Sequence, residues 1–331
     1  MTTARGLGAS LSDFASRYGL LFAWAAIIVV FGALRPETFL TTTNFQTILG
    51  SQSVLVIVTL GLIVALTAGE IDLSIAGVLT LCVVLVAKLN VVAGLPIGVA
   101  IVAALAAGLL VGATNAFFVV AIGIESIVVT LGMGTFLVGL SFAIEESQLG
   151  GISEALVDAT RGQLFGVQLA FYYGLLLTFV VWYVFAYTPL GRYLYFVGAG
   201  RDVARLSGIR VQAIRAGALI ASSMFAAVGG VVLAGLLGAT DPNVGQSFLL
   251  PAFAGAFLGA TAITPGRFNP WGSFIAVYFL VTGITGLQLL GLSGWVEQVF
   301  YGVSLILAVT LSRLAGRRRG DLQTQLGRLS Q

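Results

Sequence analysis

Ten apolar stretches, joined by short polar connections, run through the sequence. They lie at 18–34, 53–69, 73–91, 96–121, 126–144, 169–187, 214–238, 248–263, 271–290 and 294–312. About 20 apolar residues suffice for a helix to cross the hydrocarbon of a bilayer. With 58% hydrophobic and 9% charged residues and a mean hydropathy of +1.05, the composition excludes an ordinary soluble domain. The sequence predicts an all-α, polytopic transmembrane helix bundle of about ten spans.

Two features leave the number of spans open. The stretches 53–69 and 248–263 are short, and a broken or re-entrant form of either makes eight spans the alternative. The first stretch follows Arg5 and Arg17, as in a signal peptide, but residues 32–36 (GALRP) offer no good small-x-small cleavage site. We therefore expect a retained first helix.

The orientation follows from a polar stretch over 188–215. It carries one acid, Asp202, against five arginines: Arg192, Arg201, Arg205, Arg210 and Arg215. Short arginine-rich loops face the cytoplasm, and ten crossings place both termini on that side. Residues 1–331 are thus expected to form a single integral membrane domain, with a cytoplasmic N-tail (1–17), a cytoplasmic loop (188–213) and a cytoplasmic C-tail (313–331). The acidic loop 145–168 then faces outward.

The basic loop has a predicted local structure. Pro189 ends the preceding apolar stretch, and residues 198–200 (GAG) make a flexible approach to a short helix. Residues 201–207 predict two helical turns, with Gly208 as a stop. Ala204 and Gly208 are four residues apart, so they are expected to share a face of minimal bulk on which another protein could lie closely.

Several chemistries are excluded by residues that the chain lacks. It has no histidine and one cysteine, Cys82, so histidine-based catalysis, most zinc sites and an intramolecular disulfide are ruled out. The only lysine, Lys88, is preceded by Ala87 in an apolar run, so no phosphate-binding G-x-x-x-x-G-K-[ST] loop exists. We expect no catalytic, cofactor-binding or metal-binding residue. Positive-inside topology explains the basic residues without nucleic acid.

Acidic residues inside or beside apolar stretches are functional candidates, because an ionised side chain is costly in a bilayer. Glu70 and Asp72 lie in the run Ala68 to Ser74 (AGEIDLS), which predicts a helix end, a glycine-assisted turn and a new helix. Capping of the next helix by Asp72 or Ser74 is one interpretation. A role of Glu70, Asp72 and Ser74 in a translocation path or its gate is the other.

Four ordered motifs resemble the ribose-type sugar ABC transporter permeases. Gly191–Tyr193 (GRY) and Gly198, followed by residues 204–209 (ARLSGI), are similar to the cytoplasmic coupling segment of that family. Residues 68–74 are similar to its "GGIDLS" segment, residues 127–132 to its "IVTLG" segment, and residues 287–291 with the last span to its C-terminal part. The likeness extends from about residue 20 to residue 312.

The resemblance implies a multi-pass permease subunit of the bacterial inner membrane that imports a small sugar, such as a pentose, a hexose or a related polyol. It implies pairing with a second permease copy or a paralogue. A partner ABC ATPase binds ATP and Mg²⁺, and a periplasmic or extracellular binding protein delivers the sugar. Alternating access is driven by the ATPase. The residues that match the coupling segment are Gly198, Ala204, Arg205, Ser207 and Gly208.

The chain also departs from the family. Glu70 stands where the family has the second glycine of "GGIDLS", which adds a negative charge beside the predicted path. A secondary transporter driven by a proton or sodium gradient, with Glu70 or Asp72 as its ion-responsive group, is the alternative function.

Overall fold

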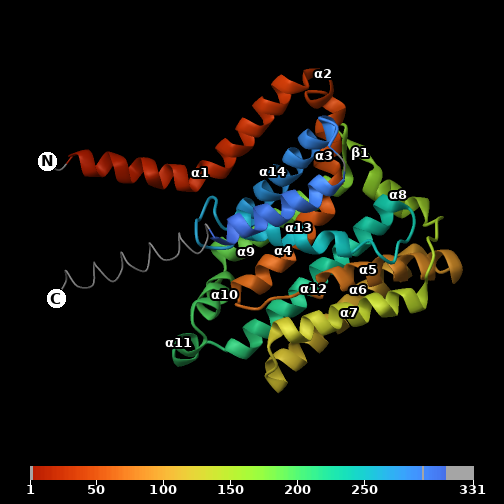
Figure 1. Ribbon diagram of the computed structural model, residues 1–331. Helices are drawn as coiled ribbons and strands as arrows, with labels where there is room; N and C mark the ends of the chain where they lie inside the picture. The colour runs from red at the N-terminus through yellow and green to blue at the C-terminus, as the bar shows by residue number, and fades with distance from the viewer. Residues whose placement is uncertain (1–2, 293, 311–331) are drawn as a thin grey trace. The chain divides into compact units, whose positions relative to one another are not determined.

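The computed structural model describes residues 3–292 and 294–310 (Figure 1). This part of the chain is mostly helical, which confirms the predicted fold class. Its elements are, in order, α1 Thr3–Leu34, α2 Pro36–Phe39, α3 Thr42–Ser51, α4 Ser53–Thr67, α5 Ile75–Ala87, the π-helical η1 Lys88–Val92, α6 Ile97–Ala116, the π-helical η2 Phe117–Ile122, α7 Ser126–Ile144, α8 Glu154–Arg161, β1 Gln163–Leu164, β2 Val167–Gln168, α9 Leu169–Tyr187, α10 Pro189–Ala199, α11 Arg201–Leu206, α12 Val211–Leu237, α13 Gln246–Gly259, α14 Pro270–Leu289, and a last helix over Trp295–Thr310.

Within the described residues, eight helices are long and apolar enough to span a membrane. The expected span 53–69 is part of a longer one, because α3 and α4 together cover Thr42–Thr67. The other short stretch remains short: α13 has 14 residues and contains Pro251, so it rises only about 21 Å. The final helix, Trp295–Thr310, is also short within its described part. Residues 311–312 and the predicted C-tail lie outside the described residues.

Helical structure begins earlier than predicted at the N-terminus. α1 starts at Thr3, so most of the predicted N-tail 1–17 continues the helix of the first span. The described residues divide into two compact units, one formed by 3–48 with 253–292 and 294–310, and the other by 49–252. The two units are distinguished by the contacts within each of them. That residues 1–331 form a single integral membrane domain stays a prediction.

The larger unit, 49–252, is built around α12, which packs against α4, α5 and α6. Small residues permit this close packing in an apolar bundle. A methyl group on Gly230 of α12 would lie 2.7 Å from the carbonyl oxygen of Leu79 on α5, and one on Gly108 of α6 would overlap Ala227. Glycine at these two positions therefore lets α12 lie directly against α5 and α6. The segments α8 and α11 lie near opposite ends of α12 (Figure 1).

The smaller unit packs α1 against α14 and α2. Trp24 of α1 donates an Nε1 hydrogen bond to Thr282 Oγ1 at 3.0 Å. Gly286 of α14 faces the ring of Phe31 so closely that a methyl group there would overlap it. The candidate site described below lies wholly in the larger unit.

Candidate functional site

Residues 188–213 are named the coupling segment after the family segment that they resemble. They form two short helices joined by an extended glycine. Thr188 precedes α10, and its Oγ1 accepts a hydrogen bond from Gly191 N at 3.4 Å, while Pro189 occupies the first helical position. α11 runs from Arg201 to Leu206 and ends before Gly208, which has φ +79°. The predicted two helical turns with a glycine stop are therefore confirmed.

The expected small-residue face of this segment is only half exposed. Ala204 is completely buried and packs with Val197 and Val211. The prediction that Ala204 and Gly208 together offer an open surface is therefore wrong for Ala204, since that side chain holds α11 against α10 and α12. Gly208 does face open space, with no atom within 4 Å of a would-be Cβ.

Apolar and basic groups instead form the exposed surface of the coupling segment. Val203 and Leu206 are 62% and 89% exposed, and Arg205 and Ser207 are exposed beside them. A groove of about 610 Å³ adjoins them, lined by Arg192, Tyr193, Phe196, Ser207, Gly208, Ile209, Arg210, Ala213 and Ile214. Such a surface, which combines exposed apolar and cationic side chains, suits a protein partner.

Gly198 serves packing rather than flexibility. It lies inside α10, contrary to the expectation of a flexible approach to α11. A methyl group at Gly198 would overlap the carbonyl oxygen of Thr67. The absence of a side chain thus lets α10 rest directly on the last turn of α4, next to the turn that follows.

The turn over 68–74 joins α4 to α5 through a glycine-based helix stop. Gly69 has φ +78°; its N–H bonds to Leu66 O at 3.1 Å and the N–H of Glu70 bonds to Ala65 O at 3.0 Å. This pair of bonds satisfies carbonyls at the end of α4 in the Schellman arrangement, which glycine favours because it tolerates positive φ. The predicted helix end and glycine-assisted turn are confirmed.

Polar side chains from two other helices hold the rest of this turn. Asp72 Oδ1 accepts hydrogen bonds from Ser74 N at 2.9 Å and Ser74 Oγ at 2.6 Å, and Asn115 of α6 donates to Ser74 Oγ at 2.9 Å. On α7, Ser126 Oγ accepts from Ile71 N at 3.1 Å.

A further bond joins Leu73 N to Thr130 Oγ1 at 3.0 Å. The contacts of Asn115, Ser126 and Thr130 were not foreseen from the sequence. Ser74 is the residue before α5 but makes no side-chain capping bond, so the capping interpretation is wrong for Ser74. Asp72 acts through a local turn instead.

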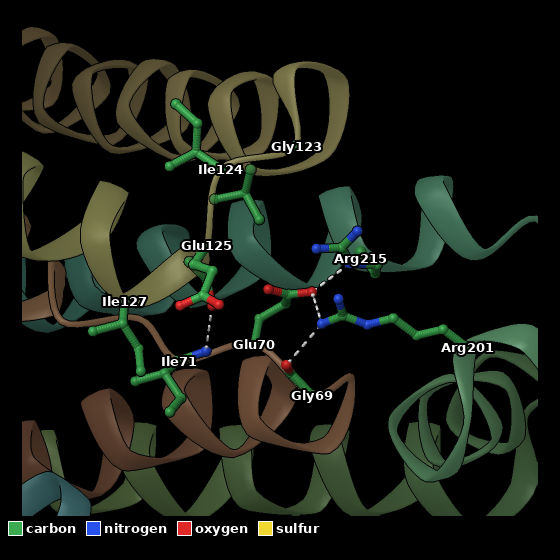
Figure 2. Close-up of a pocket in the computed structure, with 11 residues that line it drawn as sticks. Gly69, Glu70, Ile71, Gly123, Ile124, Glu125, Ile127, Arg201 and Arg215 are labelled. Atoms are coloured by element: carbon green, nitrogen blue, oxygen red, sulfur yellow. Dashed lines mark hydrogen bonds and ion pairs between the residues drawn. The ribbon is translucent and has the colours of Figure 1, made fainter.

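Glu70 lies at the meeting point of this turn and the coupling segment (Figure 2). Its side chain is 1% exposed. Its Oε1 accepts from Arg201 Nη2 at 2.8 Å and also from Arg215 Nε. The same Arg201 Nη2 donates to Gly69 O at 3.1 Å. Arg201 comes from α11 and Arg215 from α12, so one buried carboxylate connects three segments.

A pocket of about 310 Å³ opens beside this ion cluster, lined by Gly69, Glu70, Ile71, Val119, Gly123, Ile124, Glu125, Ser126, Ile127, Arg201 and Arg215 (Figure 2). Glu70 Oε2 is buried and has no hydrogen-bond partner among the described residues. Glu125, the residue before α7, is exposed. Among the residues that the structure describes, no group of three His, Cys, Asp or Glu side chains could hold a metal ion.

Comparison with known proteins assigns the chain to a family. The family model described as "Branched-chain amino acid transport system / permease component" matches residues 44–309. The D-allose transport system permease protein AlsC of Escherichia coli (strain K12) is 30% identical over 305 residues, covering 92% of this chain and 94% of that protein.

Two further relatives are similar over comparable lengths. The autoinducer 2 import system permease protein LsrD of Photorhabdus laumondii is 28% identical, covering 90% of this chain and 92% of that protein. The ribose import permease protein RbsC of Escherichia coli (strain K12) is 27% identical, covering 87% and 91% respectively. No solved structure matches. The chain therefore belongs to this family of ABC transport permeases, as its motifs predict, and is a multi-pass protein of the inner membrane.

Proposed function

We propose that the chain is the permease subunit of an ABC importer for a small sugar, either a pentose, a hexose or a related polyol. The observation that carries this proposal is the near full-length similarity to permeases named for D-allose, ribose and autoinducer 2. Two permease subunits, identical or paralogous, enclose the translocation path, and a periplasmic or extracellular binding protein delivers the substrate.

The coupling segment is the docking site for the partner ATPase, which binds ATP and Mg²⁺. Its exposed residues Arg205, Ser207 and Gly208 lie on the surface that the ATPase covers, and Ser207 and Gly208 also line the groove. Gly198 and Ala204 contribute by packing, since both are engaged inside the segment. The closeness of Gly198 to the end of α4 supports transmission of ATPase movement to the helices.

The turn 68–74 is proposed as part of the gate of the path. It interrupts the helical course between α4 and α5, and it carries buried polar side chains, Glu70, Asp72 and Ser74. Polar and irregular backbone at such a place is tolerated where protein or a cavity surrounds it. Alternating access then corresponds to displacement of this turn with the coupling segment.

Uptake measurements separate this function from gradient-driven transport. Cells that express the chain with its cognate ATPase and binding protein are given labelled pentoses and hexoses. ATP depletion and ionophore treatment are applied separately, with cellular ATP kept constant during the ionophore treatment. Uptake that survives ionophores but stops without ATP is expected. The reverse pattern would mean a secondary transporter with Glu70 or Asp72 as the ion-responsive group.

The docking assignment is tested by two substitutions of one residue. Gly208→Ala and Gly208→Trp both place a Cβ at φ +79°, so both carry the same backbone strain. Only the tryptophan adds bulk to the groove. Gly208→Trp should abolish uptake and co-purification of the ATPase without reducing membrane insertion, whereas Gly208→Ala should retain both. Normal uptake by Gly208→Trp would contradict docking at this surface.

A further inference from the structure

The ion cluster of Glu70, Arg201 and Arg215 joins segments that are far apart in the sequence. Glu70 belongs to the turn 68–74, Arg201 is the first residue of α11, and Arg215 lies in the second turn of α12. Any displacement of α11 therefore acts on the carboxylate through Arg201. Arg201 also donates a hydrogen bond to Gly69 O, so it binds both a side chain and the backbone of the turn.

The turn passes such a displacement on to other helices. Its backbone is bonded to Ser126 and Thr130 at the start of α7, and Ser74 is bonded to Asn115 of α6. It also leads directly into α5. A chain of contacts thus runs from α11 through Glu70 to α5, α6 and α7, all within the larger unit.

The turn has other means of keeping its shape. The two backbone bonds after α4 form without any contribution from the side chain of Glu70, and the bonds of Asp72 and Ser74 fix the second half. A buried ion pair is a weak source of net stability, because desolvation offsets much of the attraction between the charges. Shape and stability alone therefore do not account for a carboxylate that is 1% exposed between two arginines.

We propose that Glu70 is a positioning residue of transport, which transmits movement of the ATPase-docked coupling segment to the turn 68–74 through Arg201, with Arg215 as its fixed anchor. This inference rests on the proposed permease function. Arg201 is the mobile member because its side chain is 44% exposed and belongs to α11, whereas the side chain of Arg215 is 15% exposed in the long α12. Glu70 need not contact the sugar.

The test measures sugar imported per ATP hydrolysed by the permease reconstituted in proteoliposomes with its cognate ATPase and binding protein. Glu70→Gln keeps the shape of the side chain but removes its charge. It should lower this ratio by about tenfold, a typical coupling between two sites, while the ATPase remains bound and active. Glu125→Gln is the matched control, because it neutralises an exposed carboxylate in the same pocket and should leave the ratio unchanged.

Two further variants keep the proposal testable if Glu70→Gln does not fold. Arg201→Gln removes the partly exposed partner while the ion pair of Glu70 with Arg215 remains, and it should lower the ratio similarly. Arg201→Lys keeps a positive charge opposite Glu70 and should retain more of the ratio than Arg201→Gln. A merely structural role would lower the yield of folded protein but leave the ratio unchanged.

The outcomes distinguish this inference from the function on which it rests. If the wild-type complex fails to import sugar with ATP, the proposed function is wrong. If the wild-type complex imports and folded Glu70→Gln or Arg201→Gln keeps the wild-type ratio, the permease function stands and the positioning role is overturned. An Arg201→Lys variant no better than Arg201→Gln would likewise contradict a charge link between positions 70 and 201.

Discussion

The arginine-rich coupling segment forms an ion pair near the beginning of α5, and the acidic segment 145–168 forms one near its end. The two ion pairs differ in burial. Near the beginning of α5, Glu70 is 1% exposed and bound by Arg201 and Arg215. Just after its end, Lys88 Nζ lies 3.0 Å from Glu145 Oε2, with the two side chains 36% and 13% exposed. The ion cluster of Glu70 joins three segments inside the bundle. The ion pair of Lys88 and Glu145 joins η1 to the end of α7 at the surface.

This difference shows that charge near an apolar stretch does not by itself mark a functional residue. Exposed ion pairs contribute little to stability, because water screens them. A buried carboxylate cannot lose its partners without a large cost. We therefore expect substitutions at the two ends of α5 to differ in their effects on both stability and transport.

The largest difference is expected between Glu70→Ala and Glu145→Ala. Glu70→Ala leaves two arginine side chains without their shared counterion and should lower the free energy of unfolding by about 3 kcal/mol. Glu145→Ala removes a partly exposed pair and should lower the unfolding midpoint much less. Thermal unfolding of the purified protein in detergent measures both. Equal shifts would contradict the contrast between the buried and the exposed site.

A second pair of variants compares how tightly the two segments are packed. Gly198→Ala forces a methyl group into the carbonyl oxygen of Thr67, and overpacking of this kind should cost about 2 kcal/mol. Gly150→Ala, in the acidic segment, meets no atom within 4 Å and should change stability by less than about 0.5 kcal/mol. The same thermal assay applies. A well-tolerated Gly198→Ala would show that α10 does not rest on α4.

The smallest effect concerns pH at the end of α5. Hydrogen bonds from Ser147 and Lys88 lower the pKa of Glu145 from its ordinary value of 4.5 to about 2. Because the folded pKa is lowered, these interactions stabilise the protein above about pH 4.5 and are lost as the pH falls toward 2. The difference in unfolding midpoint between the wild type and Glu145→Gln should narrow over that range. A constant difference would rule out this linkage.

Hydropathy predicted the helical spans well but not which of them form the core. An 18-residue stretch within each of the spans Thr42–Thr67 and Ile97–Ile122 has a mean hydropathy of 2.3, yet 83% of the first stretch and 28% of the second is buried. Both α4 and α6 pack against α12, so the difference arises from the other elements that cover each helix. These are contacts between residues that are distant in the sequence. The sequence signals of glycine and proline gave the ends of α4, α9 and α11 correctly, because turn chemistry is local.

The candidate site was only partly predictable for the same reason. The sequence indicated Glu70 and the five arginines separately, but 131 and 145 residues separate Glu70 from Arg201 and Arg215. No local pattern pairs them. Ala204 was expected at the surface because alanine and glycine four apart share a helix face, but its small size instead permits complete burial between Val197 and Val211.

Cysteine labelling tests most directly whether the coupling segment is the cytoplasmic docking surface. Leu206 and Phe165 are each 89% exposed, one in the coupling segment and one in the acidic segment, and the native Cys82 is buried. A membrane-impermeant maleimide should label Leu206→Cys only in inside-out vesicles and Phe165→Cys only in right-side-out vesicles. Bound ATPase should protect Leu206→Cys alone. Labelling of Leu206→Cys from outside, or its full labelling with the ATPase bound, would contradict the account.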